Sequence, residues 1–207
     1  MLKISTPHGP PTLAQGATFA LVNGTTMIGT IFGKKRISEE KFANVFVNAV
    51  LHLTDEAFPA IVAELQEAPE FVSRPTFGPG DDDLFAQIIF AGNLMEAPKH
   101  LPSGLDQRLV QHAYSKFAPF LDQSAADLET ETIAMQRFMA RINHPSKNTV
   151  YAMSKAIFHK YDLFRNQDAY FRDMKAPNPI VLGRINKLMQ YCLWDWAELL
   201  EEMKVTA

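Results

Sequence analysis

The chain has 207 residues, of which 47% are hydrophobic and 21% are charged, and its formal net charge is −3. This composition is too apolar for a disordered chain and is typical of one globular domain, with or without an added arm. The single cysteine, Cys192, excludes intrachain disulfides and suits a reducing compartment. We find no convincing signal-peptide pattern and therefore expect a cytoplasmic protein.

Charge is spread unevenly along the chain. Residues 38–131 carry sixteen acidic and five basic side chains, whereas residues 141–187 carry nine basic and three acidic ones. The favoured explanation is electrostatic attraction between segments of one fold or of two subunits, and the alternative is a basic binding surface. We expect no nucleic-acid binding, because several aromatic residues of the basic segment fall on a predicted buried face and could not stack on bases.

Residues 1–36 are predicted to form an N-terminal arm. Two runs rich in apolar residues and threonine, 17–22 and 25–32, flank Asn23-Gly24, the dipeptide preferred in two-residue hairpin turns. We expect a short β-hairpin or extended arm, which must lie on the helices or pair with another copy because an isolated hairpin is barely stable. The stretch Leu13 to Phe32 contains too many polar residues and glycines for a good spanning helix, so we expect no membrane insertion.

Residues 37–207 are predicted to form a single helical domain. Apolar residues recur at helical spacing from Ser38 to a break near Thr54, and a second helix from Ala57 to Glu67 would complete a helical hairpin. A loop with three prolines and two glycines covers residues 69–80.

A new helix is predicted where this loop ends, at three consecutive aspartates, Asp81 to Asp83. Carboxylates are favoured at the positive end of a helix dipole, and a divalent-cation site is the less favoured alternative. A further helix is predicted over 105–120. Helices beginning at Ser124 and Val150 are then predicted to pair in an antiparallel hairpin.

The strongest helical pattern lies between Asn178 and Met203. Seven apolar residues at spacings of three and four would share one face of a single helix: Leu182, Ile185, Met189, Cys192, Trp196, Leu199 and Met203. Tyr191 and Trp194 point to another side, so we expect them to form an interface. With seven or eight helices in all, the predicted fold class is mainly α: a multi-helix bundle with an N-terminal β-hairpin or extended arm.

Two His-x-x-Asp pairs, His52 with Asp55 and His159 with Asp162, are the candidate metal ligands. Helical bundles build metal sites from such pairs, although two pairs also arise easily by chance, and we favour chance. Phosphate-loop, nucleophile-elbow, Cys-x-x-Cys and dinucleotide-binding motifs do not occur in the sequence.

Six methionines fall on predicted apolar faces: Met95, Met135, Met139, Met153, Met189 and Met203. Methionine fills irregular core space and also lines adaptable pockets, so an apolar small molecule between helices is conceivable. The favoured function is a non-enzymatic helical protein that binds itself, as a homo-oligomer, or a protein partner. The alternative is a small-molecule-binding protein or a metal-dependent enzyme with a pocket lined by methionine and aromatic residues.

Overall fold

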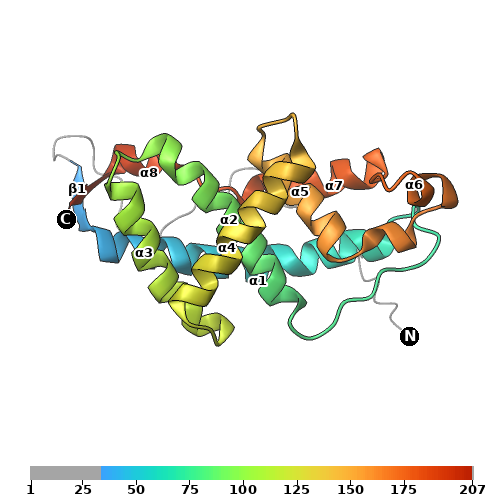
Figure 1. Cartoon of the computed structure of the whole chain (residues 1–207), viewed down its shortest axis with the longest axis horizontal. Helices are drawn as coiled ribbons and strands as arrows, with labels where there is room; N and C mark the ends of the chain where they lie inside the picture. The colour runs from blue at the N-terminus through green and yellow to red at the C-terminus, as the bar shows by residue number, and fades with distance from the viewer. Residues whose placement is uncertain (1–33, 207) are drawn as a thin grey trace, which may run out of the picture. The chain divides into compact units, whose positions relative to one another are not determined.

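The computed structural model describes residues 34–206, so the predicted hairpin and the stretch Leu13 to Phe32 lie outside the described residues. The described part holds eight α-helices and two short strands (Figure 1), which confirms the mainly α fold class. The helices are α1 (Glu39–Glu67), α2 (Asp81–His100), α3 (Leu105–Phe117), α4 (Ala125–Asn143), α5 (Thr149–Lys160), α6 (Ala169–Asp173), α7 (Pro179–Met189) and α8 (Trp196–Glu202).

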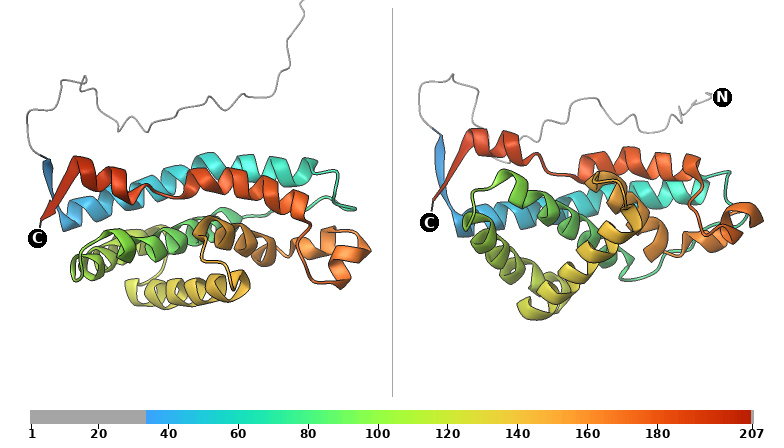
Figure 2. Two further views of the ribbon diagram at one scale, coloured as in Figure 1. Left: turned by 90° about the horizontal axis from the view of Figure 1, so that it is seen from above. Right: turned by 45° about the horizontal axis from the view of Figure 1, so that its top comes forward.

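The helices pack in layers around α1. Viewed from above (Figure 2, left), α1 runs beside α7 and α8, while α2, α3 and α5 lie on one side of this layer and α4 is outermost. The core between them is rich in aromatic rings that contact one another. Phe90, for example, stacks on Phe46 and on Phe117, with ring centroids 5.7 and 4.4 Å apart.

Helix α1 is continuous, so the predicted break near Thr54 and the helical hairpin built on it are wrong. The Thr54 hydroxyl donates a hydrogen bond to the Val50 carbonyl, 2.9 Å away, and so stays within the helix. Pro59 removes one backbone hydrogen bond. The buried face nevertheless continues in phase through Ile61 and Leu65, and packing along this face keeps both halves in one helix.

By length and composition, α1 is also apolar enough to cross a membrane. The central helix of a water-soluble bundle passes the same test, and α1 packs against α2, α3 and α7. One such helix is therefore weak evidence of membrane insertion.

The helix predicted from Asn178 to Met203 is interrupted. Helix α7 ends at Met189, a 3-10 turn covers Gln190–Cys192, and α8 begins only at Trp196. The predicted face is largely correct, because six of its seven residues are buried: Leu182, Ile185, Met189, Cys192, Trp196 and Met203. The prediction was wrong in the continuity of the helix and right in the side that it buries.

Asn93 of α2 holds this interruption in place. Its side chain is fully buried, its amide nitrogen donates to the Cys192 carbonyl (2.9 Å), and its oxygen accepts the Trp194 N–H (2.7 Å). Asn93 thus satisfies two buried backbone groups of a segment that has left the helical path. Asp195 then caps α8 by accepting the Glu198 N–H, at 2.9 Å.

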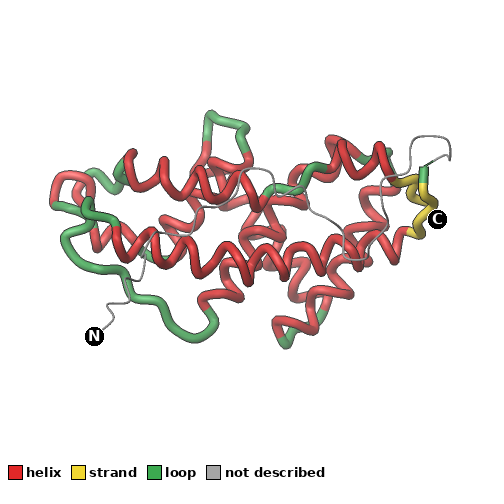
Figure 3. Tube along the Cα trace, turned by 180° about the vertical axis from the view of Figure 1, so that it is seen from behind, coloured by secondary structure: helices red, strands yellow, loops and turns green. Residues whose placement is uncertain are grey.

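The two strands are β1 (Lys35–Ser38) and β2 (Met203–Thr206), and they pair in parallel with Lys35 opposite Met203. They lie beside the C-terminus (Figure 3), where the sequence pattern predicted the end of a helix. Ile37 and Val205 pack on the core from one face of this sheet. The predicted boundary between the arm and the helical domain, between residues 36 and 37, lies within β1.

Other expectations are confirmed. α2 begins at the three aspartates, which occupy its first turn, and α4 and α5 form the predicted hairpin around a short connection. Ser124 caps α4 by accepting the Asp127 N–H at 3.1 Å.

Helices α2 and α5 cross closely at Gly92, where a Cβ atom would overlap Sδ of Met153. Five of the six methionines are buried in the core, and Met95 is partly buried against it.

Candidate functional site

The first pair of predicted metal ligands lies on the exposed side of α1. His52 Nε2 is 3.4 Å from Glu56 Oε1, and more than half of each side chain is exposed. Asp55 is exposed as well. An exposed pair of this kind on one helix contributes little to stability.

The second pair lies at the end of α5. The His159 ring packs against Phe164, with centroids 4.7 Å apart, and burial together with two nearby cations, Lys155 and Arg141, lowers the pKa of His159. Asp162 Oδ2 is 3.9 Å from Nε of Arg165. Within residues 34–206, no group of three or more His, Cys, Asp or Glu side chains could hold a metal ion, so the geometry lends the predicted metal site no support.

The predicted interface residues lie in different surroundings. Tyr191 is 70% exposed. Trp194 is only half-buried, because its ring packs on Phe42 and Phe46 with centroids 5.7 and 5.0 Å away. The structure thus presents Tyr191 to solvent, whereas the Trp194 ring packs on core phenylalanines of the same chain. Their role in an interface stays a prediction.

A pocket of about 260 Å³ opens where the chain leaves α7. It is lined by side chains from the end of α2 and from the interruption between α7 and α8: Glu96, His100, Gln190, Leu193, Trp194, Asp195 and Trp196. No methionine lines this pocket, in contrast to the methionine-lined pocket that the sequence suggested. Its lining combines aromatic and polar side chains with one leucine.

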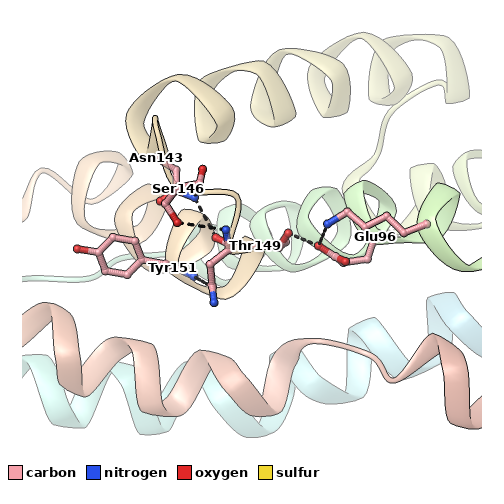
Figure 4. A network of polar contacts seen from close by, with 7 residues as sticks. Glu96, Asn143, Ser146, Thr149 and Tyr151 are labelled. Carbon is pink, nitrogen blue, oxygen red and sulfur yellow. Dashed lines mark hydrogen bonds and ion pairs between the residues drawn. The ribbon is translucent and has the colours of Figure 1, made fainter.

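Glu96 forms a fixed wall of this pocket. Its carboxylate accepts hydrogen bonds from Lys99, at 2.6 Å, and from the Thr149 hydroxyl at the start of α5 (Figure 4). Burial raises the pKa of Glu96, but the hydrogen bonds from Lys99 and Thr149 outweigh it and lower the pKa overall. Glu96 is therefore ionised at neutral pH.

The start of α5 is fixed by the same network. Asn143 donates to the carbonyls of Ser146 and Asn148, at 3.2 and 2.9 Å, and Asn148 accepts the Tyr151 N–H at 2.8 Å (Figure 4). Thr149 is thereby held where its hydroxyl can reach Glu96.

Trp196 is the one lining residue that is almost completely buried, at 1% exposure. Its indole N–H has no hydrogen-bond partner among the described residues. The centroid of the Trp196 ring lies 5.0 Å from that of Trp194 and 5.3 Å from that of Phe46. A buried donor without a partner is uncommon and requires an explanation.

A second feature is the excursion formed by residues 168–177, which includes α6. No residue of α6 is buried. Gln167, which is fully buried, closes the base of the excursion: its amide nitrogen donates to the Ala176 carbonyl (2.9 Å), and its oxygen accepts the Asn178 N–H (2.5 Å). The excursion is thus fixed at its base, while Ala169, Tyr170 and residues 172–175 are exposed to solvent.

Six large apolar side chains of the described part are highly exposed, and four of them lie on segments joined at Asn166 and Gln167. We call these four the α6 surface: Val72, Tyr170, Met174 and Ile180, each at least 56% exposed. The Val72 N–H donates to the Asn166 carbonyl at 2.8 Å, which brings the loop after α1 to this end of the bundle, where Figure 1 places α6.

Comparison of the chain with models of protein families, with curated proteins and with solved structures finds no significant match. Any functional interpretation of the pocket and of the α6 surface therefore depends on their geometry alone. Sequence reasoning missed Asn93 and Gln167, because a buried amide that bonds to backbone groups outside its own helical turn leaves no periodic pattern.

Proposed function

We propose that this protein is a cytoplasmic, self-associating helical protein whose role is interaction and not catalysis. The observation that supports this most is the α6 surface. Exposed apolar surfaces often mark protein contacts, and four of the six highly exposed large apolar side chains of the described part lie on segments joined at Asn166 and Gln167. The excursion is fixed at its base by Gln167, so its apolar side chains are presented with little loss of backbone entropy on binding.

The charges of the excursion favour a second copy of the same chain as the partner. Two acidic and two basic residues alternate along it: Asp168, Arg172, Asp173 and Lys175. In a two-fold contact each segment meets its own copy, and a segment of balanced charge can pair its cations with the partner's carboxylates. A strongly charged segment would repel its copy instead.

The α6 surface is small, so we expect a reversible dimer. Stable interfaces bury about 800 Å² on each partner, and smaller contacts are transient. Sedimentation velocity over a range of protein concentrations is the appropriate measurement. We expect the sedimentation coefficient to rise with concentration toward that of a dimer.

The test variant is Tyr170→Ser combined with Met174→Ser. We expect it to weaken association at least about tenfold, which corresponds to about 1.4 kcal/mol. The matched control is Phe120→Ser, because Phe120 is 57% exposed but lies outside the α6 surface. A wild-type protein that stays monomeric at all concentrations overturns the proposal, and so does an equal loss of association in the control.

A further inference from the structure

Met174 differs from the other methionines of the described part in its exposure to solvent. Met1 and Met27 lie outside residues 34–206, which leaves seven of the nine methionines. Five of these are buried in the core, Met95 is partly buried, and Met174 is 56% exposed. A dissolved oxidant therefore reaches the thioether sulfur of Met174 more easily than those in the core.

Met174 also belongs to the α6 surface, on which the proposed self-association depends. It directly follows α6, and its backbone N–H donates to the Tyr170 carbonyl at 3.2 Å. No residue of α6 is buried, and Gln167 holds the base of the excursion. A change of polarity at Met174 therefore alters the contact surface without removing a contact from the core.

Oxidation produces such a change of polarity. A lone pair on Sδ of Met174 attacks one oxygen of hydrogen peroxide, a sulfur–oxygen bond forms, and the O–O bond breaks. The departing oxygen takes up the proton of the transferred oxygen and leaves as water, so the sulfur loses two electrons and the peroxide gains them. The resulting sulfoxide is polar, and methionine sulfoxide reductases return it to the thioether. Covering its oxygen in an apolar contact without a donor is unfavourable.

The single thiol of the chain is poorly placed to compete for the oxidant. Cys192 is fully buried, and burial raises the pKa of its thiol to about 12. The thiolate is the reactive form of cysteine, so both low access and retention of the proton protect Cys192. Within residues 34–206, Met174 is thus the sulfur-containing side chain that is most open to oxidation.

We propose that Met174 is a site of reversible oxidation by hydroperoxides, and that its sulfoxide weakens self-association through the α6 surface. This inference rests on the proposed function, because the oxidation needs a contact to control. The same contact covers Met174 in the associated state, so oxidation proceeds from the dissociated chain. Because the two processes oppose each other, the oxidation rate of Met174 should fall as the protein concentration rises.

The test treats the full chain with hydrogen peroxide and follows each methionine by peptide mapping with mass spectrometry. We expect Met174 to be oxidised at least about tenfold faster than the five buried methionines. In sedimentation velocity, the oxidised chain should associate at least about tenfold more weakly, and its thermal unfolding should be unchanged. Methionine sulfoxide reductases for both epimers, supplied with dithiothreitol, should restore the association.

Two variants assign the effect to position 174. Met174→Leu keeps an apolar side chain of similar volume without the sulfur, so its affinity, whatever the value before treatment, should be the same after peroxide. Met1 and Met27 are present in this variant and in the wild type, so the comparison isolates Met174. Met174→Gln places a polar oxygen at the same position and should weaken association at least about tenfold without any oxidant.

The outcomes separate this inference from the proposed function. A wild-type chain that stays monomeric overturns both. A wild-type chain that associates, but does so equally tightly after Met174 has been oxidised, overturns this inference alone. Oxidation of the buried methionines before Met174, or a loss of association on peroxide treatment that persists in Met174→Leu, also overturns it.

Discussion

The crossing of α2 and α5 allows a sharp test of the packing, through the substitution Gly92→Ala. An ideal Cβ at position 92 would overlap Sδ of Met153 and lie 2.7 Å from its Cγ. Met153 is fully buried, so its side chain cannot swing out to solvent. Cγ lies near the start of the side chain, so moving it requires either a change of χ1 inside a filled core or a separation of α2 and α5.

The magnitude follows from two opposing contributions. Replacing glycine by alanine inside a helix stabilises it by about 1 kcal/mol. Overpacking a filled core destabilises by about 1–3 kcal/mol, and a clash with Cγ favours the upper part of this range. We therefore expect Gly92→Ala to lower the free energy of unfolding by about 1–2 kcal/mol.

Gly183→Ala is the matched control, because Gly183 is exposed on α7 and no described atom lies within 4 Å of a Cβ built there. We expect it to raise the free energy of unfolding by up to about 1 kcal/mol. Urea denaturation followed by circular dichroism measures both variants, and unchanged m-values would show that the two-state comparison is valid. If the Gly92→Ala variant is as stable as the Gly183→Ala variant, the close crossing of α2 and α5 at Gly92 is refuted.

A double-mutant cycle assigns the effect to the contact itself. Met153→Ala alone should cost about 2–5 kcal/mol, because it leaves a cavity. Combined with Gly92→Ala it should cost less than the sum of the single changes, since the new methyl group then has room. Strictly additive losses would show that Met153 is not the residue that the methyl group meets.

Two further predictions concern titratable groups. Burial raises the pKa of the Cys192 thiol to about 12, so this thiol should resist a thiol reagent at pH 8 until urea unfolds the chain. The unfolded chain loses the thiol proton at lower pH than the folded chain does. The free energy of unfolding should therefore fall as the pH rises from about 9 to about 12. The guanidinium of Arg108 donates to the buried carboxylate of Glu39, at 2.7 Å, and lowers its pKa, so this pair stabilises the fold above pH 4.5 and its contribution disappears as the pH falls. Arg108→Gln should therefore shift acid unfolding to higher pH in a circular-dichroism titration. Lys116→Gln removes a hydrogen bond that lowers the pKa of the exposed Glu40, where solvent screens the charges, and should cause a smaller shift; equal shifts would contradict this.

Local periodicity predicted most of the helices and the faces that they bury. It did so because burial of one helix face imposes a spacing of three and four residues that is visible in the sequence. Met189, Cys192 and Trp196 were placed correctly on a buried face even though the helix breaks between them. Thr54 shows the opposite error, since a residue that is typical of a cap bonds instead within a continuous helix.

What the sequence did not predict depends on side-chain contacts outside the helical repeat. Asn93 bonds to backbone groups 99 and 101 residues away, and Gln167 closes an excursion by bonding to backbone groups 9 and 11 residues away. Periodicity carries no information about such pairs. The pocket lies beside the interruption that Asn93 holds in place. The His-x-x-Asp spacing instead predicted a metal site at side chains that are exposed or paired with other residues.

The pairing of β1 with β2 also has a consequence for biosynthesis. The two strands stand at opposite ends of the described chain, with Lys35 opposite Met203. A ribosome adds about 5–20 residues per second, so β1 waits on the order of ten seconds or more before its partner strand has been made. During that time α1 can assemble with α2 and α3, but the sheet can close only after Met203–Thr206 has been made. β2 is the last of the described elements in chain order, so this sheet forms only after the ribosome has made all the described helices.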